Sequence, residues 1–257
     1  MNVLITSGGT VEKIDSVRGI SNISTGKLGS LIAGRFAEEP IVKKIFYICG
    51  NTALKPQSEK AEIIYVDSVS SLENAVKQVL SHTPVDIIIH AMAVSDYRVK
   101  AVTSAEIIAG MIVSKLNEIG HLDNQTAAAA VASLLKEPES IIDGEGKIGS
   151  DMEDMLIFME RTPKIISLFQ SLSPQSTLVG FKLLDNVPPD KLIETGFRIL
   201  LQNKCSFVLT NDLRDITSGQ HIGYLIDRNK NYTRFSTKTD IANAIVSAAI
   251  SERTAAI

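Results

Sequence analysis

The chain has 257 residues, of which 44% are hydrophobic and 21% are charged, and its formal net charge is −3. These values are typical of a globular protein with enough apolar side chain for a sizeable core, and they argue against a disordered chain. The small negative charge and the lack of a basic run argue against nucleic acid or a membrane surface as a partner.

Neither the cysteines nor the termini indicate an extracellular protein. Cys49 and Cys205 have no CxxC spacing and no histidine cluster beside them, so we expect reduced core thiols and leave any metal ligands unassigned. The opening MNVLITSGGT lacks the basic and long apolar regions of a signal peptide, and no apolar stretch reaches about 18 residues. We therefore expect a cytoplasmic protein without a membrane span.

Short apolar runs alternate with stretches of helical period, which predicts an α/β fold with a Rossmann-like, doubly wound, mainly parallel sheet. Strands are expected at residues 2–6, 44–49, 62–66, 85–90, 177–181 and 206–210. The first helix is expected to begin near Ser24 and Thr25, whose hydroxyls are good N-caps. Further helices are expected at 70–80, 190–202 and 238–251, and a C-terminal β-hairpin at 223–226 and 232–235.

The segment between residues 98 and 147 is too long for a plain connection between a helix and a strand. Its Ala-rich composition, followed by a loop-like 138–146, predicts a helical insertion at about 103–146. It could form a flap, an oligomer contact or a partly disordered segment. We treat 1–257 as a single domain carrying this insertion.

The loop after the first strand is the most informative candidate site, because ligands of open parallel sheets bind outside the carboxyl ends of the strands. Gly8 and Gly9 follow that strand directly, so their N–H groups can approach a phosphate, although a tight turn explains them equally well. The spacing matches neither GxGxxG nor a Walker A loop. Polar residues crowd the rest of the loop as it approaches a helix N-terminus, an arrangement suited to anions: Asp15, Arg18, Ser21, Asn22, Ser24, Thr25 and Lys27. A solvated Arg18–Asp15 ion pair is the alternative without a function.

Three further loops add polar or small residues. The first runs from His90 to Arg98, where small residues admit a flat ligand and Asp96 can hold a base, a ribose or a magnesium ion, or can cap a turn. The others are 147–150 and 162–166, the latter with 180–182 near it. Together the loops provide anion-holding groups and no Ser-His-Asp order or HExxH helix, which favours phosphoryl or nucleotidyl chemistry.

Several sequence blocks resemble one enzyme family. The string SGGTVEKIDSVRGISNISTGKLG resembles the bacterial phosphopantothenate-cysteine ligase signature, roughly GxTxExxDxVRxISNxSxGKxG, and AMAVSDYRV resembles the AAVADYR block that follows it. KIGS, TPKII, LVGFKLL and LTNDL then repeat the later blocks in order. The resemblance covers most of residues 2–213 apart from the insertion, and it points to the monofunctional bacterial type, with decarboxylation left to another polypeptide.

This resemblance implies an activity and a set of site residues. The family joins 4'-phosphopantothenate to L-cysteine through an acyl-nucleotide, using CTP with Mg2+, and acts as a homodimer. ATP stays open as the nucleotide, because GFKLLD replaces the bacterial GFAAET and FKL is similar to the eukaryotic, ATP-using branch. By position, Asn22 would hold the intermediate, Arg18 would contact the same ligand, and Lys147 would neutralise phosphate charge. The implied nucleotide-site residues are Gly8, Gly9, Thr10, Ser24, Thr25, Gly26, Lys27, Ala91, Met92, Ala93, Asp96, Pro163, Lys164, Ile165, Ile166 and Phe181.

Two other functions remain open at this point. An NAD(P)-binding Rossmann oxidoreductase would fit the strand and helix alternation, but its glycine pattern and a Tyr-xxx-Lys pair are lacking. A catalytically inert nucleotide-binding protein would keep the loops, bind CTP and release no pyrophosphate.

Overall fold

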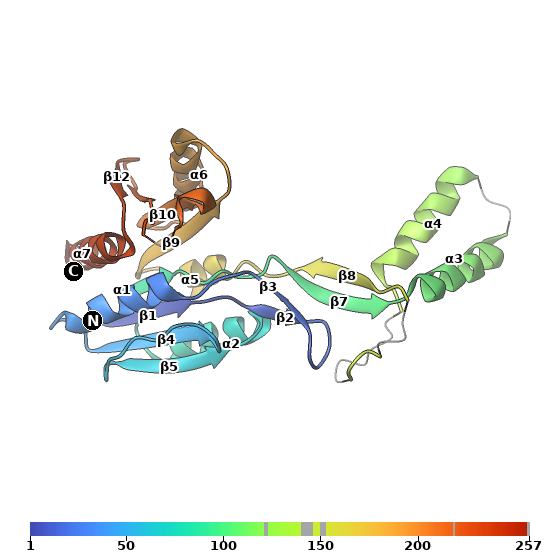
Figure 1. Cartoon of the computed structure of the whole chain (residues 1–257), viewed down its shortest axis with the longest axis horizontal. Coiled ribbons are helices and arrows are strands. Elements are labelled where there is room, and N and C mark those ends of the chain that lie inside the picture. Colours follow the sequence, from blue (N-terminus) through green and yellow to red (C-terminus); the bar gives the residue numbers. More distant parts are fainter. Residues whose placement is uncertain (121–122, 140–145, 150–152, 218, 256–257) are drawn as a thin grey trace. The chain divides into compact units, whose positions relative to one another are not determined.

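The computed structural model describes residues 1–120, 123–139, 146–149, 153–217 and 219–255 (Figure 1). These residues divide into two compact units. Unit 1 comprises the described parts of Met1–Thr10, Asn22–Val94 and Lys164–Ile257, and unit 2 those of Val11–Ser21 and Ser95–Pro163. The expected insertion at 103–146 falls within unit 2, and the single-domain assignment stays a prediction.

Unit 2 consists of two small antiparallel ribbons and a helical hairpin. The elements are β2 (Val11–Lys13), β3 (Gly19–Ser21), β7 (Tyr97–Thr103), α3 (Ala105–Ile119), α4 (Asn124–Lys136) and β8 (Leu156–Arg161). Strand β2 pairs with β3, and β7 pairs with β8 with a bulge between Val99 and Ala101. Ser104 and Asp123 cap α3 and α4 by accepting backbone N–H groups, so the expected helical insertion is confirmed. The insertion is preceded by strand β7 over 97–103, which the sequence did not predict.

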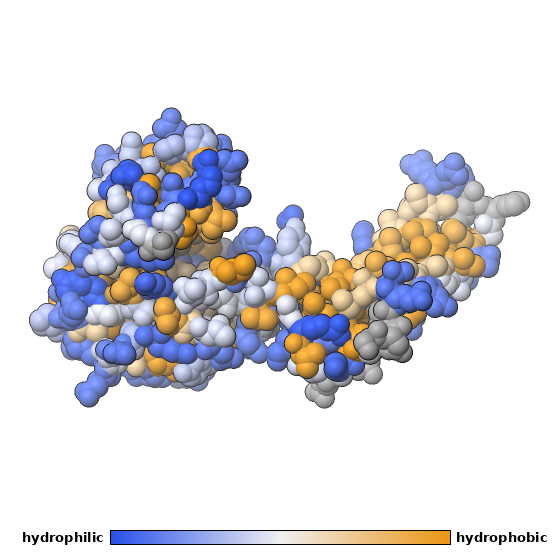
Figure 2. All heavy atoms as spheres, viewed as in Figure 1, coloured by the Kyte–Doolittle hydropathy of each residue, from blue (hydrophilic) through white to orange (hydrophobic). Residues whose placement is uncertain are grey.

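The surface of unit 2 is rich in apolar side chains. Figure 2 shows them gathered over β7–β8 and over α3 and α4. Helix α4 has no buried residue among those described, although it is largely apolar. The large hydrophobic residues exposed in these elements include Tyr97, Val113, Ile119, Leu156 and Met159. An apolar surface of this kind often marks a contact with another molecule.

Unit 1 is built on one eight-stranded sheet. Its strands are β1 (Asn2–Ser7), β4 (Lys44–Gly50), β5 (Ala61–Val66), β6 (Ile87–His90), β9 (Thr177–Leu184), β10 (Phe207–Asp212), β11 (Gly223–Asp227) and β12 (Tyr232–Phe235). Their order is β12-β11-β10-β9-β6-β1-β4-β5, with β11 and β12 antiparallel and all other pairs parallel. Numbered along the chain, the parallel strands follow the order 3-2-1-4-5-6 of dinucleotide-binding folds. The predicted fold class and the C-terminal hairpin are confirmed.

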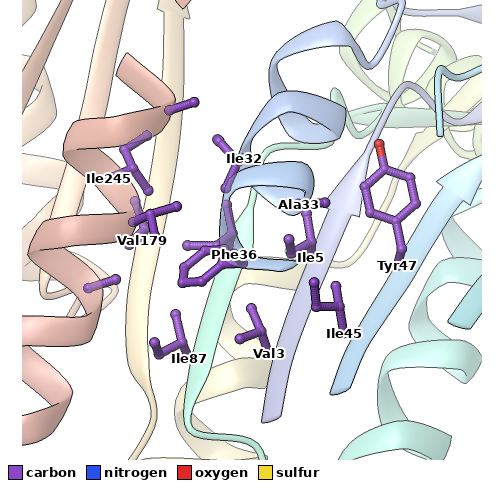
Figure 3. Packing of buried hydrophobic residues seen from close by; sticks show 14 of the residues in the cluster. Val3, Ile5, Ile32, Ala33, Phe36, Ile45, Tyr47, Ile87, Val179 and Ile245 are labelled. Carbon is purple, nitrogen blue, oxygen red and sulfur yellow. The ribbon is translucent and has the colours of Figure 1, made fainter. Parts of the chain in front are cut away.

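Helices cover both faces of this sheet because its strands are apolar on both sides. Helices α1 (Lys27–Glu38) and α7 (Lys238–Ala255) cover one face, and α2 (Val69–His82), α5 (Ile165–Leu172) and α6 (Pro189–Gln202) cover the other. A short 3-10 helix, Leu213–Asp215, follows β10. Alternation along β1 sends Val3 and Ile5 to the first face and Leu4 to the second. Figure 3 shows Phe36 of α1 and Ile245 of α7 packed in the hydrophobic core on the first face of the sheet. Burying each such side chain contributes roughly 1.5–3 kcal/mol.

The start of α1 differs from the prediction. Its N-cap is Gly26, whose backbone is in the left-handed conformation at φ 68°. Glycine has no side chain that could accept a hydrogen bond from the first N–H groups of the helix. A Cβ on Gly26 would lie 3.0 Å from both Ala53 Cβ and Ser7 Oγ, so glycine suits both the conformation and the space. Ser24 and Thr25 therefore precede the cap, and the expectation that they form it is wrong.

In the described part of the chain, no helix is both long and apolar enough to cross a bilayer.

Candidate functional site

Strands β1 and β6 are neighbours at the point where the strand order reverses, and the loops that follow them lie side by side. The N–H of Ala91 donates to Thr6 O at 3.0 Å, and that of Ala93 donates to Gly8 O at 2.8 Å. The N–H of Thr10 in turn donates a hydrogen bond to Ala93 O at 3.2 Å. Pairing thus continues past the strands and fixes both loops at the carboxyl edge of the sheet, where ligands of this topology bind.

The two glycines after β1 allow neighbouring loops to approach closely. A Cβ on Gly8, whose φ is +82°, would lie 2.6 Å from Ala53 Cβ, and one on Gly9 would lie 2.7 Å from Asn22 O. A Cβ on Gly50 would in turn lie 2.7 Å from Gly9 O. This packing accounts for the glycines, so their role toward a phosphate stays a prediction.

Asn22 is the predicted catalytic residue that unit 1 contributes. Its Nδ2 donates to Val94 O at 3.1 Å, and its side chain is exposed. Its backbone oxygen is the atom that Gly9 approaches. The structure thus places an exposed amide side chain beside both loops at the β1–β6 switch point, and its catalytic role stays a prediction.

The remaining polar residues of the first loop surround the start of α1. The N–H of Gly26 donates to Ser24 Oγ and that of Lys27 to Thr25 Oγ1, each over 3.4 Å. Thr25 and Lys27 are exposed. The positive end of the helix dipole and the lysine together form an environment that favours an anion.

The predicted residues that follow β6, begin α5 or lie in β9 differ in whether they expose a side chain or only their backbone to a ligand. Met92 is 7% exposed and Ile165 is 2% exposed, and both pack in the core with Leu4 and Val208. Only their backbones remain for a ligand. Ala91, Ala93, Ile166 and Phe181 are half-buried, whereas Lys164 is exposed directly before α5. Thr162–Ile166, expected as a loop, therefore includes the start of a helix.

His90 ends strand β6 beside these loops. Its Nδ1 lies 2.8 Å from Thr6 Oγ1 in a buried hydrogen bond, and its ring packs edge-on against Phe169. Burial lowers the pKa of His90 to about 4, so the ring is neutral at physiological pH. This residue is a buried structural group rather than a proton donor at neutral pH.

In unit 2, Asp15 and Arg18 form an ion pair with an Oδ2–Nη2 distance of 2.6 Å. The Asp15 side chain is fully buried whereas that of Arg18 is 41% exposed, so the pair is not the solvated one considered from the sequence. Burial raises the pKa of Asp15, but hydrogen bonds from Val17, Arg18 and Ile148 outweigh it and hold the pKa well below its usual range. Asp15 is therefore a stable anion, and sequence reasoning missed this role.

Lys147 lies in the same unit and directly precedes Ile148, whose backbone is bound to this ion pair. The N–H of Ile148 donates to Asp15 Oδ2 at 3.2 Å, and Arg18 Nη2 donates to Ile148 O at 3.0 Å. Lys147 itself is exposed. The structure thus brings two predicted catalytic residues, Arg18 and Lys147, to one place. Most of the loop-like stretch expected at 138–146 lies outside the described residues, as does Ser150.

Asp96 and Pro163 also belong to unit 2 and lie near each other. The N–H of Thr162 donates to Asp96 O at 3.1 Å, and Thr162 Oγ1 donates to Ser95 O at 2.5 Å. Asp96 and Pro163 are exposed. Two of the predicted loops therefore meet here.

Within the described residues, no group of three or more His, Cys, Asp or Glu side chains could hold a metal ion.

Comparison with known proteins gives a family for this arrangement. The model of the DNA/pantothenate metabolism flavoprotein C-terminal domain matches residues 1–109 and 101–252. A structure of the DNA/pantothenate metabolism flavoprotein from Streptococcus pneumoniae is 29% identical, covers 96% of this chain and 97% of its own, and superposes with a TM-score of 0.77. A Cab2 mutant in complex with phosphopantothenate-cysteine shares the fold, with a TM-score of 0.67 at 18% identity, over 99% of this chain and 87% of its own.

Among curated proteins, the chain is similar to a coenzyme A biosynthesis bifunctional protein CoaBC of Thermococcus kodakarensis, with 26% identity over 230 residues. That alignment covers 88% of this chain and 45% of the relative. The corresponding protein of Methanocaldococcus jannaschii is 25% identical over 82% of this chain and 40% of its own length. The chain thus spans less than half the length of these relatives. Because the family model covers nearly all of its residues, the chain belongs to the DNA/pantothenate metabolism flavoprotein C-terminal domain family.

Proposed function

We propose that the chain is a phosphopantothenate-cysteine ligase, which joins 4'-phosphopantothenate to L-cysteine in coenzyme A biosynthesis. Family membership and the coenzyme A relatives support this proposal. The observation that carries it is Asn22, an exposed amide beside the Gly9 and Val94 loops at the switch point of the sheet. This is where an activated acyl-phosphate would need a neutral hydrogen-bond donor.

The nucleotide is proposed to be CTP, with ATP as the alternative. The start of α1 suits a triphosphate, because its dipole and Lys27 both favour negative charge. Ala91 and Ala93 are half-buried and have small side chains, which would suit the approach of a flat base to the β6 loop. Mg2+ is proposed to bind largely through the triphosphate oxygens, as magnesium commonly does.

The reaction would proceed in two displacements. A carboxylate oxygen of phosphopantothenate attacks the α-phosphorus of CTP, and the bond to the pyrophosphate leaving group breaks. The amine of cysteine then attacks the acyl carbon of the resulting acyl-cytidylate, and the bond to CMP breaks while the amine loses a proton. Asn22 would hold the acyl-nucleotide by hydrogen bonds. Lys147 and Arg18 would neutralise charge that develops on the phosphate oxygens.

We also propose that the enzyme is a homodimer. The apolar surface over β7–β8 and α3–α4 supports this, because such surfaces are costly to leave in water (Figure 2). Sedimentation of the purified chain at several concentrations tests it, and a monomer throughout would refute it.

The test of the activity is pyrophosphate release by the purified protein with phosphopantothenate, Mg2+ and either CTP or ATP, each with and without cysteine. Release that requires phosphopantothenate, together with CMP or AMP, supports the ligase and identifies its nucleotide. Nucleotide binding without release under every condition would refute it in favour of an inert binding protein.

A further inference from the structure

We propose that Asp15 is a positioning residue that holds the segment bearing Lys147 in place during the reaction. This inference rests on the proposed function, because it assigns Lys147 a role toward the phosphate. The residues that carry it are Asp15, Arg18 and Ile148, all within unit 2.

Asp15 joins two stretches of chain that are 133 residues apart in sequence. Its Oδ1 accepts the N–H groups of Val17 at 2.9 Å and Arg18 at 2.7 Å, which closes the local turn. Its Oδ2 accepts Arg18 Nε at 2.9 Å and the N–H of Ile148 at 3.2 Å. One buried carboxylate therefore fixes both the turn and the residue that follows Lys147.

Arg18 completes the connection from the opposite direction. Its Nη2 donates to Ile148 O at 3.0 Å, so both polar backbone groups of Ile148 are bound to the Asp15–Arg18 pair. The Ile148 side chain is 7% exposed, which adds apolar packing at the same point. Lys147 itself stays exposed, and its backbone is anchored through the following residue, Ile148.

A fixed backbone matters because catalytic charge is effective only where charge develops. Displacement of a charged group by about 1 Å can lower a rate by about 100-fold. The Asp15 carboxylate and Ile148 are both buried, so loss of the carboxylate leaves the Ile148 N–H without its acceptor rather than exchanging it for water. Asp15 would therefore act through Lys147 without touching the substrate.

The first test measures the anchor without any catalysis. Hydrogen–deuterium exchange of the peptide that covers 146–149 is compared in wild type, Asp15→Asn and Asp123→Ala. Asp123 is a matched control, since its carboxylate also accepts backbone N–H groups in unit 2 but caps α4. We expect exchange at 146–149 to accelerate at least about tenfold in Asp15→Asn only, the change that loss of about 1.4 kcal/mol of protection gives. Equal exchange in all three proteins would overturn the inference.

The second test asks whether Asp15 acts through Lys147. Asp15→Asn is expected to lower kcat by about 10- to 100-fold in the wild-type background. In a Lys147→Gln background the same change should lower it less than about threefold, because groups that act as one unit are not additive. The same fold-loss in both backgrounds would show that Asp15 has only a structural role.

A second pair of variants covers the case in which Asp15→Asn fails to fold. Ile148→Pro removes the N–H that Asp15 binds, whereas Ile148→Ala keeps this N–H and loses similar packing. We expect kcat to fall at least about tenfold further in the proline variant than in the alanine variant. Equal losses would contradict the inference. A wild-type protein that releases no pyrophosphate would refute the proposed ligase, while the exchange experiment would still decide whether Asp15 anchors 146–149.

Discussion

Helix α1 contains two glycines whose surroundings predict opposite effects of the same substitution. A Cβ on Gly29 would lie 2.2 Å from Ser7 Oγ and 2.7 Å from Ser7 Cβ, whereas a Cβ on Gly34 would meet nothing within 4 Å. Both positions are inside the helix. Alanine there is favoured over glycine by about 0.8–1 kcal/mol of helix propensity.

The difference between Gly29→Ala and Gly34→Ala therefore isolates the packing cost at Gly29. Rotation of the Ser7 side chain about its Cα–Cβ bond can move Oγ away from the new methyl group. The Ser7 Cβ cannot move in this way because it is bonded to the backbone of strand β1, so helix and strand must separate. Overpacking of this kind typically costs about 1–3 kcal/mol. At about 2–4 °C per kcal/mol for a protein of this size, we expect Gly34→Ala to raise the Tm by about 2–4 °C. The Tm of Gly29→Ala should lie about 2–12 °C below that of Gly34→Ala.

Thermal unfolding followed by circular dichroism at 222 nm, a standard helix band, measures both variants. Gly29→Ala should also cost less in a Ser7→Gly background, because that change removes both atoms that the new methyl group meets. An equal rise in Tm for Gly29→Ala and Gly34→Ala would refute the close packing of α1 on β1 at the carboxyl edge.

Three other predictions use different readouts. Asn22→Asp should keep the Tm, because the side chain is exposed, but should lower pyrophosphate release about 100-fold or more by repelling the acyl-phosphate; a wild-type rate would refute its role. Burial lowers the pKa of His90 and of His221 to about 4, with Lys238 adding to the effect on His221. Below pH about 6.5 the unfolded chain then binds protons that the folded chain does not, so stability should fall by up to about 1.4 kcal/mol per pH unit for each histidine between pH 6.5 and 4; a Tm that rises on acidification would contradict this. Arg253→Ala removes the guanidinium bonds to Asp86 and to Gln175 O at the opposite, amino edge of the sheet, so denaturant titration should show a loss of about 1–3 kcal/mol while turnover at saturating substrate is kept.

The strands of the main sheet could be predicted closely because their burial on both faces leaves a strong signal. All six parallel strands lie within about two residues of the expected bounds at their starts, since runs such as Ile87–Ile89 are apolar without interruption. The ribbons β2–β3 and β7–β8 were missed. Their strands are short or exposed, and polar and apolar residues such as those in Tyr97–Thr103 do not separate into two clear faces. Helix α5 has only eight residues, too few for a periodic pattern to stand out.

The candidate site was predictable in its location but less so in its side chains. A loop after β1 that meets the loop after β6 follows from the strand order, and Asn22 Nδ2 donates to Val94 O beside these loops, whereas its catalytic role stays a prediction. Sequence position could not show that Met92 and Ile165 turn their side chains into the core, because neighbouring residues of one motif can face opposite sides. Asp15 was considered only as a polar loop residue or as the partner of Arg18 in a solvated ion pair, since Ile148 is distant in sequence and no local pattern connects it to Asp15.

A comparison of Asp15 with Asp212 shows what a sequence can reveal about such anchors. Each aspartate has an arginine two or three residues later, and each carboxylate is at most 1% exposed while the side chains of Arg18 and Arg214 are 41% and 55% exposed. Asp212 also accepts N–H groups from a distant segment, those of Asn186 at 3.3 Å and Val187 at 2.9 Å. Arg214 and these N–H groups hold the pKa of Asp212 well below its usual range. In both places the nearby arginine and the bound N–H groups offset the cost of burying the charge, so the carboxylate stays ionised and can bind a remote backbone segment. The local pair is visible in the sequence, whereas the segment that it fixes is not. An Asp–Arg pair in a loop therefore indicates an anchor whose target only the fold can identify.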